Sequence, residues 1–445
     1  MKEGIKSAIC VLLLAGCVAS GVFADNVKLS YMYWGSPAED EATKQALKDF
    51  EAANPGITVN PLFAPGTKAE FDAKLKAMSE SDTLPDVGYF RPESVHEYGS
   101  NGFFLDLTTY IAKDNLKKDY LAQTWITQNG KIIGAYTAAE AQVMYYNKKL
   151  LQAAGVPLPP TDYTKAWTWD QAVKYWTMLT VDKNGKHPGD SGFDPKKITQ
   201  FGVNHEVWSG MLYPAIWSNG GEVFSVDGKQ ILVDSPATVQ AIQRLADLRL
   251  KNKVMSAPGS TEYQSAGSTD PKVLMQNGQL AFYISGAWEM LDFAKMSFPL
   301  GVGALPIQKK PAQLYISGVN VVYKTSKHPE EAWKLQKWMM TPEKTLNLYA
   351  GGLWMPTKAS WYSNKDDLNK WLSNPAHPDG FKAAVVDSMT VARAEPIGIK
   401  NYDQLWAEYI NPELDKVWIG KASAETALKT AADKIRKSGL LQGTW

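Results

Sequence analysis

The sequence has very little cysteine, and this scarcity excludes thiol chemistry from most of the chain. Its two cysteines, Cys10 and Cys17, both lie near the amino end, ahead of the first predicted strand. The rest of the chain therefore has neither a thiolate nucleophile nor a disulfide. A chain of 445 residues is long enough to be stabilised by packed cores, and two large lobes are its simplest division.

Excess charge of either sign is also missing. Forty-seven lysines and arginines oppose 46 aspartates and glutamates, which gives a formal net charge of +1. The chain therefore has no broad basic field to attract nucleic acid or an anionic membrane, and we do not expect either as a partner.

Hydrophobic runs long enough to cross a membrane are absent as well, since a membrane helix needs about 20 apolar residues. The short apolar run Ala8–Ala15 follows two lysines, which is the layout of a secretory signal peptide. Cleavage after Ala24 would remove residues 1–24, whereas a lipobox-like stretch ending at Cys17 would leave a lipid anchor there. We favour the first route, because the first strand begins only ten residues after Cys17 and lipoprotein tethers are usually longer. Both routes predict export to the periplasm or to the extracytoplasmic face of the cell membrane.

Motifs for catalysis and metal binding are not found. The chain has no Gly-x-Ser-x-Gly elbow, and His205-Glu206 lacks the second histidine of a zinc-protease helix. Asp182 begins a stretch similar to a calcium loop, but the twelfth position is Phe193, which cannot bind the ion. We therefore expect no enzyme activity, no metal and no cofactor. A secreted glycoside hydrolase stays open as the enzymatic alternative, because it needs only two suitably spaced acids.

Aromatic residues, by contrast, are abundant. The chain contains 16 tryptophans and 20 tyrosines, more flat rings than a core of this size needs. Such rings can cover the apolar face of a sugar, while carboxylates, guanidinium groups and amides bind its hydroxyls. The composition is therefore compatible with a carbohydrate ligand.

Hydrophobic periodicity predicts alternating strands and helices. The predicted strands lie at residues 27–33, 57–63, 86–90, 144–146, 201–203, 280–284 and 319–323. The clearest predicted helices lie at residues 37–53, 68–78 and 235–251. Ser235 is expected to cap the last of these, and the part from Glu330 onward is expected to be nearly all helix. This alternation predicts an α/β fold of mostly parallel sheets flanked by helices.

Several short patterns occur in a characteristic order. They are residues 50–57 (FEAANPGI), 84–87 (LPDV), 101–107 (NGFFLDL), 145–150 (YYNKKL), 154–157 (AGVP), 168–170 (TWD), 218–221 (SNGG), 277–282 (NGQLAF) and 318–320 (GVN). In this order and spacing the chain resembles the family-1 extracellular solute-binding proteins of bacterial ABC importers, in the sugar-binding, maltose-binding-protein-like branch. The similarity covers nearly the whole chain after residue 24.

This resemblance implies a two-lobed periplasmic-binding-protein fold of type II, with a ligand cleft between the lobes. Residues 25–139 and 299–340 would form the first lobe, and residues 140–298 and 341–445 the second, with a helical C-terminal part. The resemblance also implies a monomer that binds a mono- or oligosaccharide and closes by hinge motion. Its partners would be the membrane permease subunits of an ABC importer.

The resemblance, together with the ends of the predicted strands, selects candidate ligand-binding residues. They are Trp34, Phe90, Arg91, Glu93, Glu140, Trp208, Trp288, Gly318, Asn320, Trp354 and Arg393. The aromatic members would stack on sugar rings, Glu140 would bind sugar hydroxyls, and Gly318 would allow the backbone to approach the ligand. A same-fold binder of glycerol phosphate, a polyamine or a peptide is the non-sugar alternative, and it would need a charged cleft.

Overall fold

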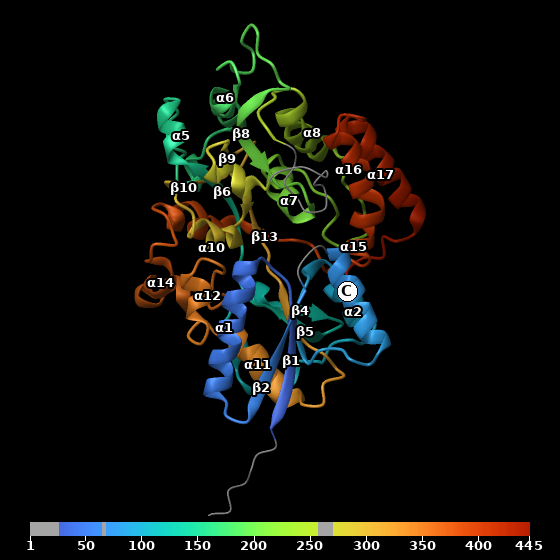
Figure 1. Ribbon diagram of the computed structural model, residues 1–445. Coiled ribbons are helices and arrows are strands. Elements are labelled where there is room, and N and C mark those ends of the chain that lie inside the picture. Colours follow the sequence, from blue (N-terminus) through green and yellow to red (C-terminus); the bar gives the residue numbers. More distant parts are fainter. Residues whose placement is uncertain (1–25, 65–67, 257–269) are drawn as a thin grey trace, which may run out of the picture.

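The computed structural model of the protein describes residues 26–64, 68–256 and 270–445 (Figure 1). The predicted signal peptide, and with it Cys10 and Cys17, lies outside the described residues. Two large sheets occupy different halves of the molecule, one below the other in Figure 1. Within the described ranges, no helix is both long and apolar enough to cross a membrane.

The first sheet, in the lower half of Figure 1, has six strands in the order β2-β1-β3-β12-β5-β4. Its strands are β1 (Val27–Tyr33), β2 (Ile57–Phe63), β3 (Val87–Phe90), β4 (Trp125–Gln128), β5 (Lys131–Tyr136) and β12 (Val319–Val322). The helices of this half are α1 (Pro37–Ala53), α2 (Lys68–Glu80), α3 (Val95–Ser100), α4 (Thr108–Lys113) and α11 (Pro329–Met339). Helices α1 and α11 contact strands of this sheet directly.

Helix α1 shows how local sequence fixes an element. The Ser36 hydroxyl accepts a hydrogen bond from the Glu39 amide, and the Glu39 carboxylate accepts one from the Ser36 amide, so the two form a capping box. Pro37 occupies the first helical position, where its missing N–H is not needed. The buried face consists of Ala38, Thr43, Ala46, Leu47 and Phe50. The helix has the bounds that the sequence predicts.

The second sheet has five strands in the order β10-β6-β9-β8-β7. Its strands are β6 (Gln142–Asn147), β7 (Val181–Asp182), β8 (Ile198–His205), β9 (Leu280–Gly286) and β10 (Leu300–Gly303). The accompanying helices are α5 (Lys148–Ala153), α6 (Trp169–Leu179), α7 (Ser209–Ser218), α8 (Pro236–Leu250), α9 (Pro271–Gln276) and α10 (Met290–Phe293). Ser235 lies at the start of α8 as predicted, but its hydroxyl donates to the Thr238 hydroxyl at 3.0 Å and caps no backbone amide.

The C-terminal part is mostly helical, as expected. Its elements are α12 (Leu346–Ala350), α13 (Ser360–Ser363), α14 (Lys365–Leu372), β13 (Ala392–Ala394), α15 (Tyr402–Gln404), α16 (Asn411–Trp418) and α17 (Ala424–Ser438). Helix α12 contacts α1, whereas α16 and α17 pack on α8. Residues 341–445 therefore contribute to both halves of the molecule, and the prediction that all of them join the second half is wrong.

The strand directions differ from the expected mostly parallel arrangement. Within the two large sheets, the parallel pairs are β1–β2, β1–β3 and β8–β9, and the other pairs are antiparallel. The β4–β5 hairpin turns at Asn129 and Gly130, whose positive φ angles of 49° and 78° suit a tight hairpin turn. The alternation of strands and helices in the sequence does not predict antiparallel pairing, because the direction of a pair depends on which two strands become neighbours in the sheet. The sheets are therefore mixed.

The chain passes several times between the two sheets. Strand β5 lies in the first sheet and β6 in the second, so one passage occupies residues 137–141. The sequence places the return at Pro299, but β10 pairs with β6 and still belongs to the second sheet. The chain rejoins the first sheet only at β12, after β11 (Gln313–Tyr315) has paired with β13. The predicted boundary at residue 299 is therefore too early.

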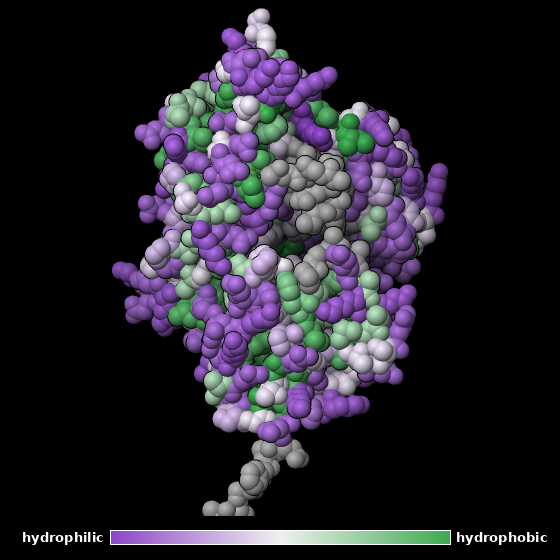
Figure 2. Space-filling view, in the orientation of Figure 1, coloured by the Kyte–Doolittle hydropathy of each residue, from purple (hydrophilic) through white to green (hydrophobic). Residues whose placement is uncertain are grey.

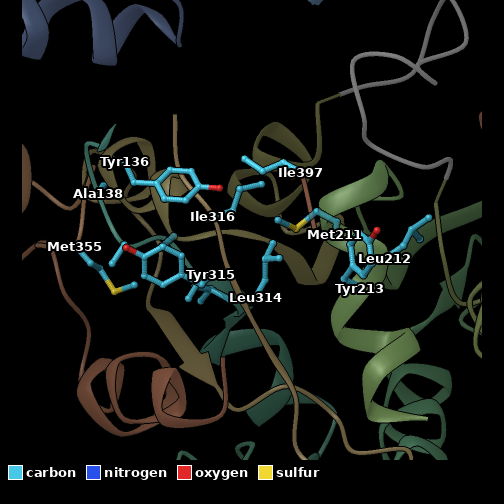
Figure 3. Packing of buried hydrophobic residues seen from close by; sticks show 14 of the residues in the cluster. Tyr136, Ala138, Met211, Leu212, Tyr213, Leu314, Tyr315, Ile316, Met355 and Ile397 are labelled. Carbon is cyan, nitrogen blue, oxygen red and sulfur yellow. The ribbon is translucent and has the colours of Figure 1, made fainter. Parts of the chain in front are cut away.

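Packed side chains fill the region between the two sheets where these passages lie (Figure 3). Tyr136 at the end of β5, Ile316 after β11 and Met211 of α7 are each at most 4% exposed. The Tyr136 and Tyr315 rings meet edge to face, with their centroids 5.6 Å apart. One continuous hydrophobic cluster therefore joins the cores of both halves.

Candidate functional site

The surface is hollowed near the middle of the view in Figure 2, between the two halves. Three aromatic side chains meet next to the first sheet. Trp34 follows β1, Tyr89 lies in β3, and Trp354 follows α12. The Trp34 and Tyr89 rings stack with centroids 5.2 Å apart, and the Tyr89 and Trp354 rings lie 5.7 Å apart. We call these three residues the first ring cluster.

Tyr89 takes the position that the sequence assigns to Phe90. Phe90 is fully buried in the core, where its ring meets Phe71, Tyr98 and Phe104 edge to face. Neighbouring side chains of a strand point to opposite faces of the sheet, so only one of these two rings can join Trp34. The expectation that Phe90 contacts the ligand does not fit this placement, and Tyr89 is the residue that sequence reasoning missed.

Gly318 and Asn320 also have roles inside the protein. The Gly318 amide donates to the Tyr89 hydroxyl at 3.2 Å, and a Cβ at Gly318 would lie 2.2 Å from the Tyr89 ring. The glycine therefore permits a close approach, but the approaching group in the structure is Tyr89. Asn320 is fully buried in β12, where its side-chain oxygen accepts a hydrogen bond from Tyr31 at 2.8 Å.

The two charged residues after β3, Arg91 and Glu93, have different surroundings. The Arg91 guanidinium lies over the Trp34 ring, 4.5 Å from its centroid, a distance suited to a cation–π contact. Glu93 lies in the short turn Pro92–Ser94 and acts electrostatically on Glu395 and Tyr136. Arg91 therefore joins the first ring cluster, and Glu93 belongs to a different set of buried polar groups.

Two tryptophans from the second sheet form a matching pair. Trp208 follows β8 and Trp288 follows β9, and their ring centroids are 6.3 Å apart. The strands are parallel neighbours, so their carboxyl ends, and the residues after them, lie at one edge of the sheet. Both rings lie against glycines, since a Cβ at Gly210 or Gly286 would be 2.3 or 2.2 Å from the nearest ring atom. We call Trp208 and Trp288 the second ring cluster.

Acidic groups surround the second ring cluster. The Trp208 indole N–H and the Tyr283 hydroxyl each donate to the Glu206 carboxylate at 2.6 Å. Burial raises the pKa of Glu206, and these hydrogen bonds oppose that rise. Lys272 pairs with Glu289 and with Asp292, in both cases at 2.8 Å. Sequence reasoning did not select Glu206 as a ligand-binding residue, although its place at the end of a predicted strand was the available signal.

Elements next to the two ring clusters contact each other. Helix α1, which follows Trp34, contacts α10, which follows Trp288. The pKa of Glu39 in α1 is raised to about 7, first by burial, while Asp292 raises it and Lys272 lowers it. At the rim, Lys295 lies 3.9 Å from Glu41. Side chains of opposite halves are therefore within electrostatic reach of one another.

Glu140 lies where the chain passes from one sheet to the other. Its backbone pairs with Ile316, and its side chain is only 2% exposed. The Oε1 atom accepts a hydrogen bond from the Met355 amide at 3.3 Å, and Oε2 has no hydrogen-bond partner among the described residues. Burial raises the pKa of Glu140 well above its usual value, and the nearby Glu39 raises it further.

The side-chain contacts of Arg393 are with residues outside both ring clusters. Its guanidinium binds Glu222 through two contacts of 2.7 and 3.1 Å and lies over the Trp217 ring, 4.4 Å from its centroid. The nearby Glu395 is buried, and its Oε1 atom accepts hydrogen bonds from Ser209 at 3.0 Å and Tyr402 at 2.5 Å. The structure thus uses Arg393 in a surface ion pair.

No group of three or more histidine, cysteine or acidic side chains that could hold a metal ion occurs within the described ranges. The Asp182 carboxylate, at the calcium-like stretch, instead accepts hydrogen bonds from the backbone amides of Asn184, Lys186 and Asp194 at 2.8 to 2.9 Å. The arrangement between the halves can stack flat ligand faces on indole and phenol rings and can bind hydrogen-bond donors through carboxylates. Ring stacking and hydrogen bonding of these kinds are typical of a ligand-binding site.

Comparison with known proteins finds a matching family and similar sequences. Residues 45–378 match the family described as bacterial extracellular solute-binding protein. A maltooligosaccharide ABC transporter solute-binding lipoprotein of Streptococcus pneumoniae is 24% identical, over 82% of this chain and 79% of its own.

Solved structures show the same fold. An ABC substrate-binding protein of Listeria monocytogenes in complex with cycloalternan gives a TM-score of 0.79 at 26% identity, covering 93% of this chain and 99% of that one. The maltose/maltodextrin-binding domain of Bdellovibrio bacteriovorus bound to maltotriose gives a TM-score of 0.73 at 20% identity, covering 92% and 100%. Because the family match spans well over half of its length, the chain belongs to the bacterial extracellular solute-binding protein family.

Proposed function

We propose that this protein captures a mono- or oligosaccharide outside the cytoplasm and delivers it to an ABC importer. The observation that carries the proposal is the presence of two ring clusters, one next to each sheet. They are Trp34, Tyr89 and Trp354 beside the first sheet and Trp208 and Trp288 at an edge of the second. Rings from two sides can cover both ends or both faces of a sugar chain. Carbohydrates appear in the names of the similar proteins from Streptococcus, Listeria and Bdellovibrio. These names support the same ligand class.

In this proposal the two halves act as lobes that close on the ligand. A ligand shifts such an equilibrium only if it binds the closed form better than the open one, which requires contacts to both lobes. Glu140 lies where the chain passes between the two sheets. Its backbone pairs with Ile316, and Glu39 acts on it electrostatically, so a ligand bound there would be close to both lobes. The closed, ligand-bound monomer is then the form that the permease subunits bind, at the periplasmic or extracytoplasmic side of the membrane.

The proposal includes export but leaves two routes to it. Either a signal peptide of residues 1–24 is removed, or a lipid is attached at Cys17. Mass spectrometry of the mature amino end distinguishes the two, because one begins at Asp25 and the other at a lipidated Cys17.

Ligand titration tests the proposed function. The protein is titrated with a panel of neutral mono- and oligosaccharides and of charged metabolites, and binding is followed by tryptophan fluorescence and calorimetry. At least one carbohydrate should bind and raise the melting temperature, and no product should form. Binding of charged non-sugar metabolites alone would refute the carbohydrate proposal, and release of a hydrolysis product would favour a glycoside hydrolase.

A tryptophan substitution locates the site. Trp288→Ala should weaken carbohydrate binding by about tenfold or more, because one buried stacking surface is lost. Trp338→Ala is the matched control, since Trp338 is also a partly buried indole but packs on Phe50 within the first half. Equal affinity of the Trp288 variant and the control would remove Trp288 from the site.

A further inference from the structure

Glu206 is an acid buried at the edge of the second sheet, beside the second ring cluster. Its side chain is 7% exposed, and its backbone amide donates to the Ile284 carbonyl of β9 at 3.1 Å. The residue is therefore held between the end of β8 and strand β9. Burying an acid costs free energy that a well-packed apolar side chain would not cost. The contacts of the Glu206 carboxylate have to offset this cost.

The hydrogen-bond donors to this carboxylate include two aromatic side chains. The Oε2 atom of Glu206 accepts from the Trp208 indole N–H, and the Oε1 atom accepts from the Tyr283 hydroxyl, both at 2.6 Å. Lys272 forms its ion pairs with other acids and acts on Glu206 through its charge. Each of the two aromatic donors meets a different oxygen, so the carboxylate fixes two rings at once.

The Trp208 ring is the part of this arrangement that keeps an accessible surface. Trp208 is half-buried, whereas Tyr283 is 2% exposed. The ring lies against Gly210, where a Cβ would be 2.3 Å from the nearest ring atom. Rotation of the indole about its side-chain bonds would break the hydrogen bond to Glu206. The bond and the glycine therefore favour one orientation of Trp208, in which its plane lies 34° from that of Trp288.

Other indoles show that packing alone does not require such an acceptor. The Nε1 atoms of Trp34, Trp176 and Trp338 are buried and have no hydrogen-bond partner in the part of the chain that the structure describes. The fold thus tolerates a buried indole N–H without an acceptor. The acid at position 206 is therefore better explained by the orientation that it gives to Trp208 than by the need to satisfy one N–H group.

We propose that Glu206 is a positioning residue, whose carboxylate holds the Trp208 indole in one orientation for stacking on a carbohydrate and does not itself bind the ligand. A ring that is already ordered loses less rotational freedom when the ligand binds, so the affinity is higher. This inference rests on the proposed function, because it assigns a role within the same binding site.

The first measurement needs no ligand. NMR of protein labelled isotopically at the tryptophan nitrogens shows the indole N–H signals, and Trp208→Phe identifies the Trp208 signal by its loss. Hydrogen exchange of this N–H with solvent should be at least about tenfold faster in Glu206→Ala, because the acceptor is gone. Glu206→Gln keeps one acceptor oxygen and should restore part of the protection. Equal exchange rates in Glu206→Ala and in the unsubstituted protein would overturn the inference.

Glu413→Ala is the matched control for the loss of a buried acid. Glu413 is 2% exposed and forms ion pairs with Lys416 and Lys434 in the C-terminal helices. Its replacement should leave exchange of the Trp208 N–H unchanged even if it lowers the melting temperature. If Glu206→Ala does not fold, as judged by its melting curve, Glu206→Gln serves instead and should give a smaller increase in exchange.

The second measurement is a double-mutant cycle on the Kd for maltotriose, or for the tightest-binding sugar of the panel if maltotriose does not bind. Glu206→Ala and Trp208→Phe should each raise the Kd by about twofold to tenfold, because the ring is no longer held. In the double variant, Glu206→Ala should add less than about twofold, since phenylalanine has no N–H for the acid to hold. Fully additive effects would show that Glu206 acts on the ligand by another route and would overturn the inference.

These outcomes separate the inference from the proposed function. If a carbohydrate binds but neither the N–H exchange nor the Kd responds to Glu206→Ala, the inference is overturned and the proposed function stands. If no carbohydrate of the panel binds, the proposed function is overturned, and with it the role of Trp208 in stacking on a sugar. The exchange measurement then still decides whether Glu206 holds the ring.

Discussion

Glu395 offers a sharp test of the electrostatics between the two halves. Its side chain is 2% exposed, one oxygen accepts hydrogen bonds from Ser209 and Tyr402, and the other oxygen has no partner among the described residues. Burial raises its pKa from 4.5 to about 8, and the neighbouring Glu93 adds to the rise. The folded protein therefore keeps the carboxyl proton over a range of pH in which the unfolded chain has lost it.

The sign and size of the effect follow from proton linkage. As the pH rises from about 5 to about 8, the unfolded state has already released the proton and the folded state has not, so the free energy of unfolding falls. The stabilisation is fully present below the unfolded pKa and is lost as the pH reaches the folded pKa. A difference between 4.5 and about 8, at about 1.4 kcal/mol for each pH unit, gives a loss of up to about 5 kcal/mol.

Replacing Glu395 by glutamine removes the titration but keeps an oxygen that can accept the hydrogen bonds from Ser209 and Tyr402. Glu395→Gln should match the unsubstituted protein near pH 5 and should exceed it near pH 8 by up to about 5 kcal/mol in the free energy of unfolding. Urea unfolding, followed by tryptophan fluorescence at several pH values, measures this difference. Glu425→Gln, at an exposed position, is the control and should leave the pH dependence unchanged.

Two results would refute this reasoning. The first is an equal change of unfolding free energy with pH in Glu395→Gln and in the unsubstituted protein. The second is a glutamine variant that is less stable near pH 8, which would mean that the ionised carboxylate is stabilised in the folded state.

Three further substitutions in the first half and one in the second test where side chains point. Phe90→Ala should lower the free energy of unfolding by about 3 to 5 kcal/mol, measured by urea unfolding, and should leave the ligand Kd unchanged in the folded protein. Tyr89→Ala should instead weaken ligand binding, and an unchanged Kd would remove Tyr89 from the site. Gly318→Ala should also raise the Kd, because its Cβ would lie 2.2 Å from the Tyr89 ring, and equal Kd values would contradict this. Arg393→Ala breaks an ion pair with Glu222 whose side chains are 47% and 39% exposed, so it should change stability by less than about 1 kcal/mol and leave the Kd unaltered; a large rise in Kd would place Arg393 in the site.

Local sequence determined the first three elements of the first half, whereas strands β4 and β5 of the same sheet were not predicted. The strands at 27–33 and 57–63 and the helix at 37–53 have the bounds that periodicity and capping predict. Their signals are contained within a few neighbouring residues, such as the Ser36 and Glu39 capping box and the Asn54 stop. Elements of this kind are specified by residues that are close together in the sequence.

The ends of strands β8 and β9 could also be read from the sequence. Trp208 and Trp288 each follow a predicted strand, and the structure brings them to within 6.3 Å of each other. The sequence could predict that each residue lies at a strand end, because strand ends are local features. The parallel pairing of β8 with β9, which makes the two ends neighbours, is a long-range contact that only the fold shows.

The sequence by itself thus determined several of the helices and strands, the absence of thiol chemistry beyond residue 17, and the number of rings and acids. The tertiary structure decided which of these meet. It turned Tyr89 and not Phe90 toward Trp34, kept β10 in the second sheet, and paired Arg393 with Glu222. The physical reason is that burial, strand partners and electrostatic neighbours depend on residues far apart in the chain, and no local pattern specifies them.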